Sequence, residues 1–224
     1  RFVTDSLGSC MSSRPKFFVA REQINNNKVT LTGSDVSHIR TVLRLKAGDS
    51  IQVISDSDKW LTVRLVEVKT KEVKGEVVAS VTINVESPLA VHLGQALTKG
   101  NKFDVILRKS VELGVRSITP LMTERCVVKT HRTEVGKKIE RWKKIVLESS
   151  KQCGRSKIPL VAEDVETLET FCRKNDHQDL KLIFWELEEK KTLKDIKLDV
   201  QPRSVAVLIG PEGGFSQAEI GRAH

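Results

Sequence analysis

A glycine-rich segment at residues 209–215 is the feature of the sequence that most directly suggests chemistry. It reads Ile-Gly-Pro-Glu-Gly-Gly-Phe and follows the apolar run Ser204–Ile209, which has the composition of a buried strand. In an open α/β sheet, ligands bind outside the carboxyl ends of the strands, and glycine lets the backbone approach a ligand closely. We therefore predict a ligand-binding loop, called the glycine loop below, formed by Ile209, Gly210, Pro211, Glu212, Gly213 and Gly214.

Two other interpretations of the glycine loop remain open. One is a tight strand-to-helix turn that binds no ligand, and the other is a phosphate cradle. The cradle is disfavoured because the segment lacks a G-x-G-x-x-G or G-K-[ST] pattern and because the carboxylate of Glu212 would repel a phosphate. A carboxylate fits better beside a cationic or hydroxyl-bearing ligand.

A basic stretch in the middle of the chain is the second candidate. The net charge of +9 is concentrated at residues 87–157, which hold 16 basic and 6 acidic residues, whereas residues 158–201 are acidic. Such a patch is typical of a polyanion-binding surface, although a solvated helix face that binds nothing remains the alternative. The side chains suited to phosphate and base contacts are Arg125, Lys129, Lys137, Lys138, Arg141, Lys144, Gln152 and Arg155.

A third candidate lies near the N-terminus, in the segment from His38 to Asp49. Arg40 and Arg44 are four residues apart, so we expect them on one helical face, where they could clamp a phosphate together. A lone histidine such as His38 is more often structural than catalytic.

Composition excludes several classes of protein. No apolar run is long enough to span a bilayer, and residues 1–10, which we leave out of the fold, lack the apolar core of a secretory signal. The four cysteines show no C-x-x-C spacing, so we expect reduced thiols in a cytoplasmic protein, with no metal site and no disulfide framework.

Periodicity divides the chain into two predicted domains, at residues 14–86 and 87–224. The first is mainly β: short β-prone runs and period-two segments fill it, and a single helix capped by Ser34 carries Val36, Ile39, Val42 and Leu43 on its apolar face. This pattern predicts a small, mainly β barrel.

In the second domain strands alternate with helices, which predicts a mainly parallel sheet. Strands are expected at residues 90–97, at 115–119 up to Pro120, at 126–129, at 180–185 and at Ser204–Ile209. Helices are expected at 101–113 with Gly114 as the stop, at 134–149, at 166–173 and after the cap Ser216.

Taken together, these segments resemble the RsmE family of the SPOUT superfamily, whose members methylate N3 of a uridine in 16S ribosomal RNA. The resemblance covers roughly residues 14–220. It is carried by motifs that occur in the family's order: His38 with Val-Leu-Arg-Leu at 42–45 and Gly-Asp at 48–49, Lys109 with Glu-Leu-Gly-Val at 112–115, Glu-Arg at 124–125 with Arg-Trp at 141–142, Gln152 with Gly-Arg at 154–155, and the glycine loop.

The resemblance implies an α/β protein with an N-terminal PUA-like β barrel that binds RNA and a C-terminal SPOUT domain with a trefoil knot. It also implies a homodimer, 16S ribosomal RNA of the small subunit or its assembly intermediate as partner, and S-adenosylmethionine as cofactor. The glycine loop would form one wall of the cofactor pocket, and Glu186 with Leu187 another. The family continues past the final helix into the segment that closes the knot, whereas this sequence stops at His224; we therefore expect weak or no cofactor binding.

Methyl transfer to uracil N3 needs removal of the imide proton and stabilisation of charge on the carbonyl oxygens. Arg125 is the expected donor, because arginine stays charged and can fork onto oxygen atoms. Glu212 is expected to order the cofactor or to act as the base. A SPOUT enzyme for ribose 2′-OH or transfer RNA, a non-catalytic RNA-binding protein and, more distantly, a metabolic nucleotide-binding enzyme remain alternatives.

Overall fold

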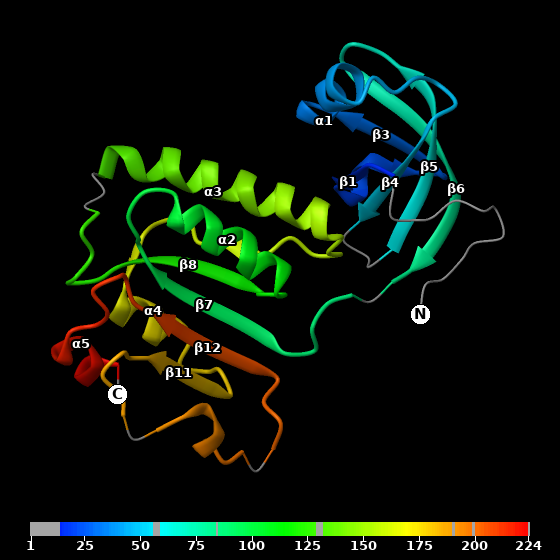
Figure 1. Cartoon of the computed structure of the whole chain (residues 1–224). Coiled ribbons are helices and arrows are strands. Elements are labelled where there is room, and N and C mark those ends of the chain that lie inside the picture. The colour runs from blue at the N-terminus through cyan, green and yellow to red at the C-terminus, as the bar shows by residue number, and fades with distance from the viewer. Residues whose placement is uncertain are drawn as a thin grey trace. The chain divides into compact units, whose positions relative to one another are not determined.

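The computed structural model describes residues 14–55, 59–83, 85–128, 132–189, 191–198 and 200–223. The chain divides into two compact units (Figure 1). The N-terminal unit contains the described residues up to Val85 together with Gly154–Lys157, and the C-terminal unit contains the rest, from Glu86 onward. The segment Gly154–Lys157 thus belongs by its contacts to the first unit, although it follows a helix of the second.

The N-terminal unit is built on one six-stranded mixed sheet of order β1-β4-β5-β6-β3-β2. β1 pairs with β4 in parallel and the other neighbours are antiparallel. Its buried face collects apolar side chains of alternating positions, such as Ile51, Val53 and Val63. The strands are β1 (Lys16–Val19), β2 (Ile24–Asn25), β3 (Lys28–Thr32), β4 (Ser50–Ser55), β5 (Lys59–Val68) and β6 (Glu72–Thr82).

The helix of this unit differs from the prediction. It begins after Gly33, whose φ is +68°, rather than with Ser34 as its cap, and α1 (Ser34–Ser37) continues into a wider π-type turn, η2 (His38–Val42). Arg44 lies beyond this turn in a left-handed conformation with φ +54°. The prediction that Arg40 and Arg44 share a helical face is therefore wrong, because the helix ends before Arg44.

The C-terminal unit contains an all-parallel sheet of order β10-β8-β7-β12-β11, with β9 also paired to β8. This confirms the predicted parallel sheet. Parallel neighbours arise here because a helix or a long connection returns the chain to the same end of the sheet between successive strands. The strands are β7 (Ala90–Ala96), β8 (Ser117–Met122), β9 (Leu160–Val161), β10 (Glu166–Thr167), β11 (Leu180–Phe184) and β12 (Ser204–Ile209).

Helices cover both faces of this sheet. α2 (Lys102–Glu112) and α3 (Arg132–Cys153) pack together on one face (Figure 1). Between them, the ring centroids of Phe103 and Trp142 lie 4.5 Å apart. α4 (Leu168–Lys174) and α5 (Gln217–Arg222) join the core cluster on the other face. β12 contributes side chains to the cores on both faces of the sheet. Val207 packs toward the α2–α3 side, whereas Leu208 packs toward α4 and α5, because successive side chains of a strand point to opposite faces.

Several predicted boundaries in this unit need correction. Residues 126–128 follow a turn and form no strand, and residue 129 lies outside the described residues. The helix expected at 166–173 starts later, because residues 166–167 pair with β8 as β10; Thr167 then caps α4 through a hydrogen bond from the backbone N–H of Thr170 at 3.2 Å. α2 ends before Gly114, whose φ is +92°, and Ser216 caps α5, both as predicted.

Pro120 does not end its strand, and the reason is the position that it occupies. The carbonyl of Ile118 accepts from the N–H of Ala162, whereas that of Leu121 accepts from the N–H of Leu97 on the opposite side. The backbone groups of Pro120 therefore point to the same side of β8 as those of Ile118. On that side, Pro120 lies at the gap between the end of β9 and the start of β10. Its missing N–H costs no ladder hydrogen bond there.

We predict that Leu107→Ala destabilises the C-terminal unit by about 2–5 kcal/mol, because Leu107 is fully buried between α2 and the sheet and its removal leaves a cavity. Leu113→Ala is the control, since Leu113 is 85% exposed at the end of the same helix; its effect should stay within about 0.5 kcal/mol. Urea unfolding followed by circular dichroism measures both, and equal effects would contradict the core assignment.

Candidate active site in the C-terminal unit

The carboxyl ends of β7, β8, β11 and β12 lie at one edge of the parallel sheet, and a hollow opens there. The hollow has a volume of about 390 Å³ and is formed by the glycine loop after β12 and the residues at the end of β11. Its lining consists of Phe184, Trp185, Glu186, Ile209, Gly210, Pro211, Glu212 and Gly214. Predicted cofactor residues from two separate segments are therefore brought together.

The conformation of the glycine loop requires its glycines. Gly214 has φ +66°, and a Cβ atom placed on it would lie 2.0 Å from the carboxyl carbon of Glu186. The N–H of Gly214 donates to the carbonyl of Pro211 at 2.9 Å, which closes the turn. The side-chain amide of Gln95 on β7 donates to the carbonyl of Gly210 at 3.4 Å and so ties the start of the loop to the neighbouring strand.

Arg125 reaches this loop from the turn that follows β8. Its Nη1 donates to the carbonyl oxygen of Gly213 at 2.8 Å and lies 3.5 Å from Oε1 of Glu186. The side chains of Arg125 and Glu186 are both 45% exposed, so the guanidinium remains accessible to a ligand. Arg125 thus lies beside the hollow, with hydrogen-bond donors left over.

Glu212 is held at the amino-terminal end of α2. Its Oε1 accepts from the ammonium of Lys102 at 2.9 Å and from the backbone N–H of Lys99 at 3.2 Å. The hydrogen bond from Lys102 is the largest of the effects that lower the pKa of Glu212 to about 2. A carboxylate with so low a pKa is a poor proton acceptor near neutral pH, so the geometry favours ordering the loop over acting as the base.

Other residues of the site were missed by the sequence analysis. Lys99 and Lys102 follow the carboxyl end of β7, so the rule that located the glycine loop could also have found them. Trp185 Nε1 and Thr98 Oγ1 are buried without a hydrogen-bond partner near these strand ends, and no sequence pattern indicates this. Leu187, predicted as a cofactor residue, is 61% exposed and lies outside the lining of the hollow.

The predicted RNA-binding residues on α3 and after it differ in how exposed they are. On α3, Lys137, Lys144 and Gln152 are exposed and share one helical face, while Lys138 is half-buried. Arg141 lies on the same face but forms an ion pair with Asp104, whose side chain is 8% exposed. Arg155 is buried in the N-terminal unit, and Lys129 lies outside the described residues.

Arg40 and Arg44 meet in the N-terminal unit by a different route from the predicted one. Both line an open hollow of about 660 Å³, together with Lys46, because the chain reverses at the left-handed Arg44. His38 packs its ring edge-on against Phe17 at 5.9 Å between centroids, in keeping with the structural role expected for it.

Among the described residues, no group of three or more histidine, cysteine, aspartate or glutamate side chains is placed to hold a metal ion. No helix in the same residues is long and apolar enough to cross a membrane. Cys126, Cys153 and Cys172 are free thiols.

Comparisons with known proteins agree with this arrangement. A family model described as an RNA methyltransferase domain matches residues 85–224, and one described as an RNA methyltransferase PUA domain matches residues 31–78. The chain is 31% identical to the ribosomal RNA small subunit methyltransferase E of Bacillus subtilis, over 86% of this chain and 77% of that protein. It is 32% identical to the Synechocystis protein of the same name, over 99% of this chain and 71% of that protein.

Solved structures are similar as well. A Legionella pneumophila methyltransferase in complex with S-adenosylmethionine has a TM-score of 0.84 at 36% identity, covering 94% of this chain and 85% of that chain. The ribosomal RNA small subunit methyltransferase E of Neisseria gonorrhoeae, bound to S-adenosylmethionine, has a TM-score of 0.81 at 28% identity with the same coverage. Fold, site and family models define an RNA methyltransferase with a PUA domain. Within that class, the chain belongs to the RsmE family.

We predict that the carboxyl group of Glu212 titrates near pH 2 and that Lys102→Met moves its midpoint up toward 4.5, because the main hydrogen bond to the carboxylate is lost. Since the folded-state pKa is lowered, the stabilisation from this contact is complete above about pH 4.5 and is lost as the pH falls toward 2. Carbon-13 NMR titration measures the midpoint. Lys109→Met is the control, since Lys109 pairs with Glu112, and an unchanged midpoint in Lys102→Met would contradict the contact.

Proposed function

We propose that this chain transfers the methyl group of S-adenosylmethionine to N3 of a uridine in 16S ribosomal RNA. The observation that carries the proposal is the hollow at the ends of β11 and β12, with Arg125 beside it, in a member of the RsmE family. Two similar solved proteins bind S-adenosylmethionine, which supports the same cofactor here, and we propose it in place of the weak or absent binding expected from the sequence.

The residues around the hollow suit this cofactor. Its volume of about 390 Å³ falls within the range of small-molecule sites, roughly 300–1,000 Å³. The carboxylate of Glu186 lies in the wall, where it can attract a cationic ligand, and the glycine loop offers backbone groups without side chains in the way. The proposed cofactor residues are therefore Glu186 and the glycine loop; Leu187 is left out because its side chain does not line the hollow.

The bound cofactor supplies an electrophilic methyl group on its sulfonium. Arg125 is proposed to hold the uracil carbonyl oxygens and to stabilise the negative charge that spreads onto them as N3 loses its proton. Glu212 is proposed to hold the glycine loop against α2 through Lys99 and Lys102. Glu212 is not assigned as the base, because its low pKa makes it a poor proton acceptor; the N3 proton is proposed to pass to hydroxide or a buffer base in the solvent before the methyl group is transferred.

RNA is proposed to contact exposed cationic side chains, and one amide side chain, of the two units. Lys137, Lys144 and Gln152 present one face of α3, and Arg40 with Arg44 lines the hollow of the N-terminal unit. These side chains suit phosphate oxygens, which need exposed positive charge and hydrogen-bond donors. Arg155 is left out because it is buried.

Further parts of the proposal follow from membership of the family. We infer PUA-like RNA-binding and SPOUT methyltransferase domains at residues 14–86 and 87–224, a homodimer as the assembly, and a cytoplasmic location. The substrate would be the small ribosomal subunit or its assembly intermediate. Sedimentation equilibrium tests the dimer directly.

We predict that incubation with S-adenosylmethionine and small ribosomal subunits produces 3-methyluridine, detected by mass spectrometry of the nucleosides. Arg125→Ala should lower kcat about 10²- to 10³-fold, as removal of a charge-stabilising donor does elsewhere. Arg108→Ala, which changes an exposed arginine of α2, is the control. Methylated ribose or methylated transfer RNA would identify a different SPOUT activity, and unmodified RNA that is nevertheless bound would indicate a binding protein.

We predict that affinity for 16S ribosomal RNA falls as salt rises, because phosphate contacts release counterions. The variant Lys137→Ala/Lys144→Ala should flatten the slope of log K against log salt by about 1 to 2. Lys181→Ala serves as the control, since Lys181 lies on β11 and pairs with Asp176 at 2.8 Å. Filter binding at several salt concentrations measures the slope. An equal slope in the α3 double variant and in Lys181→Ala would rule out Lys137 and Lys144 as phosphate contacts.

A further inference from the structure

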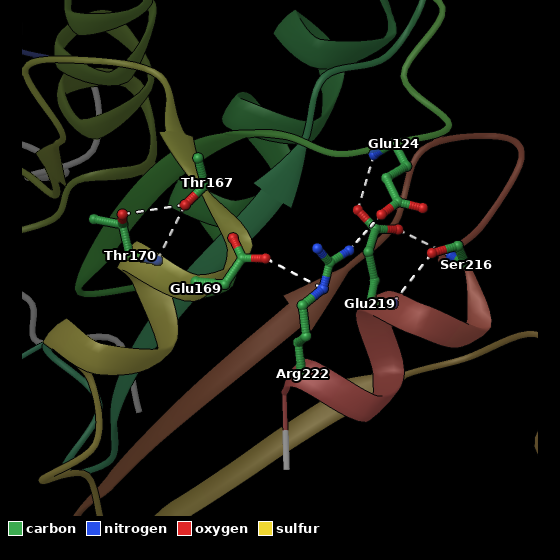
Figure 2. Close-up of polar contacts among 7 residues, drawn as sticks. All are labelled: Glu124, Thr167, Glu169, Thr170, Ser216, Glu219 and Arg222. Atoms are coloured by element: carbon green, nitrogen blue, oxygen red, sulfur yellow. Dashed lines mark hydrogen bonds and ion pairs between the residues drawn. The ribbon is translucent and has the colours of Figure 1, made fainter.

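A buried carboxylate, that of Glu219 on α5, bridges the two segments that form the site (Figure 2). Its side chain belongs to a residue only 3% exposed. Oε2 accepts from the backbone N–H of Ser216 at 2.9 Å, just after the glycine loop, and Oε1 accepts from the backbone N–H of Glu124 at 2.8 Å. One carboxylate thus holds the exit of the glycine loop and the turn after β8.

This bridge acts on Arg125, because Arg125 directly follows Glu124. The guanidinium of Arg125 returns to the glycine loop and donates to the carbonyl of Gly213 at 2.8 Å. The two segments are therefore joined twice, once through Glu124 and Glu219 and once through Arg125 and Gly213. The hydrogen bond to Glu219 holds the backbone of Glu124 in place, and this limits where the Cα atom of the next residue, Arg125, can lie.

Two exposed ion pairs of Arg222 also contact this region. Arg222 on α5 forms an ion pair with the side chain of Glu124, and its Nε lies 3.3 Å from Oε1 of Glu169 on α4 (Figure 2). Exposed ion pairs of this kind contribute little by themselves. The buried bridge through Glu219 is the stronger link, because each carboxylate oxygen accepts from a backbone N–H and the side chain is shielded from water.

We propose that Glu219 is a positioning residue for Arg125, so that it acts on methyl transfer without touching either ligand. The proposal rests on the proposed function, in which Arg125 stabilises the charge on uracil. A competing role is capping alone, because Ser216 and Glu219 form a capping box at the start of α5. The two roles differ in the bond to Glu124, which capping does not require.

The test compares Glu219→Gln with Ser216→Ala. Glutamine keeps the shape of the side chain, but its NH₂ group cannot accept a hydrogen bond, so one of the two backbone N–H groups loses its partner. Ser216→Ala removes the 3.1 Å hydrogen bond from the N–H of Glu219 to Ser216 Oγ and the contact of Ser216 Oγ with the side chain of Glu124, but it leaves both backbone N–H groups bound to the Glu219 carboxylate. Glu219→Gln should lower kcat about 10- to 100-fold, as displacement of a catalytic group by about 1 Å does, with KM for RNA unchanged, while Ser216→Ala stays near the wild type.

A double-variant cycle separates positioning from an independent effect. If Glu219 acts through Arg125, adding Glu219→Gln to Arg125→Ala lowers kcat no further than Arg125→Ala alone. A multiplied loss in the double variant, or an equal loss of kcat in Ser216→Ala, would overturn the proposal.

Hydrogen exchange at the amide of Glu124 provides a readout that does not depend on activity. Glu219→Gln should speed this exchange, and Ser216→Ala should leave it unchanged. If the wild type transfers no methyl group, the proposed function fails, yet faster exchange still supports the positioning of the turn and unchanged exchange overturns it. If Glu219→Gln does not fold, Glu219→Asp replaces it: the shorter side chain cannot hold both backbone N–H groups that the glutamate binds at 2.8 and 2.9 Å, so kcat should again fall and exchange at Glu124 should speed up, and no change in either would overturn the proposal.

Discussion

The parallel direction of β8, β7, β12 and β11 is the constraint on which the site depends, because it turns four carboxyl ends toward one edge of the sheet. Residues far apart in the sequence meet there, as Lys99 and Glu212 do. None of these contacts is local. The site exists only when the whole sheet has formed in this order, which links the capacity to bind a ligand to the folding of the C-terminal unit.

At that edge of the sheet, side chains lie directly against the backbone of the glycine loop, because the loop has no side chains of its own at its glycine positions. Gly214 leaves room for the carboxylate of Glu186, and Arg125 rests on the carbonyl of Gly213. A ligand in the hollow would therefore meet backbone carbonyl groups, the carboxylate of Glu186 and the guanidinium of Arg125, which is held by its contacts with Gly213 and Glu186. Such preorganisation is what charge stabilisation requires, because little reorganisation remains for the moment of reaction.

Periodicity and local capping signals predicted much of this fold, since strand alternation, Gly114 and Ser216 act over a few residues. The errors arose where distant contacts override local preference. Pro120 is tolerated because of a gap between two partner strands, and residues 166–167 join the sheet before α4 begins. In the N-terminal unit, Arg44 has a left-handed conformation beyond the end of the helical turn, so it does not share a helical face with Arg40 as predicted.

The same distinction applies to the site. The glycine loop and Arg125 were predicted from residue type and family motifs. The spacing of Ser216 and Glu219 indicates a capping box, but the second hydrogen bond of Glu219 reaches a turn 95 residues away, which no local pattern encodes. Lys99 and Lys102 differ in this respect, because they follow the carboxyl end of β7 and the rule for strand ends could have found them, although not their pairing with Glu212.

Phe215, the residue directly after the glycine loop, has a fully buried ring that packs with Leu121, Phe171 and Leu208. Loosening the loop means withdrawing this ring from its core cluster, which for a phenylalanine represents about 3–5 kcal/mol. The loop therefore belongs to the same cooperative unit as the sheet, not to the readily opened surface segments. Warming would then loosen the glycine loop and melt the surrounding core in a single transition.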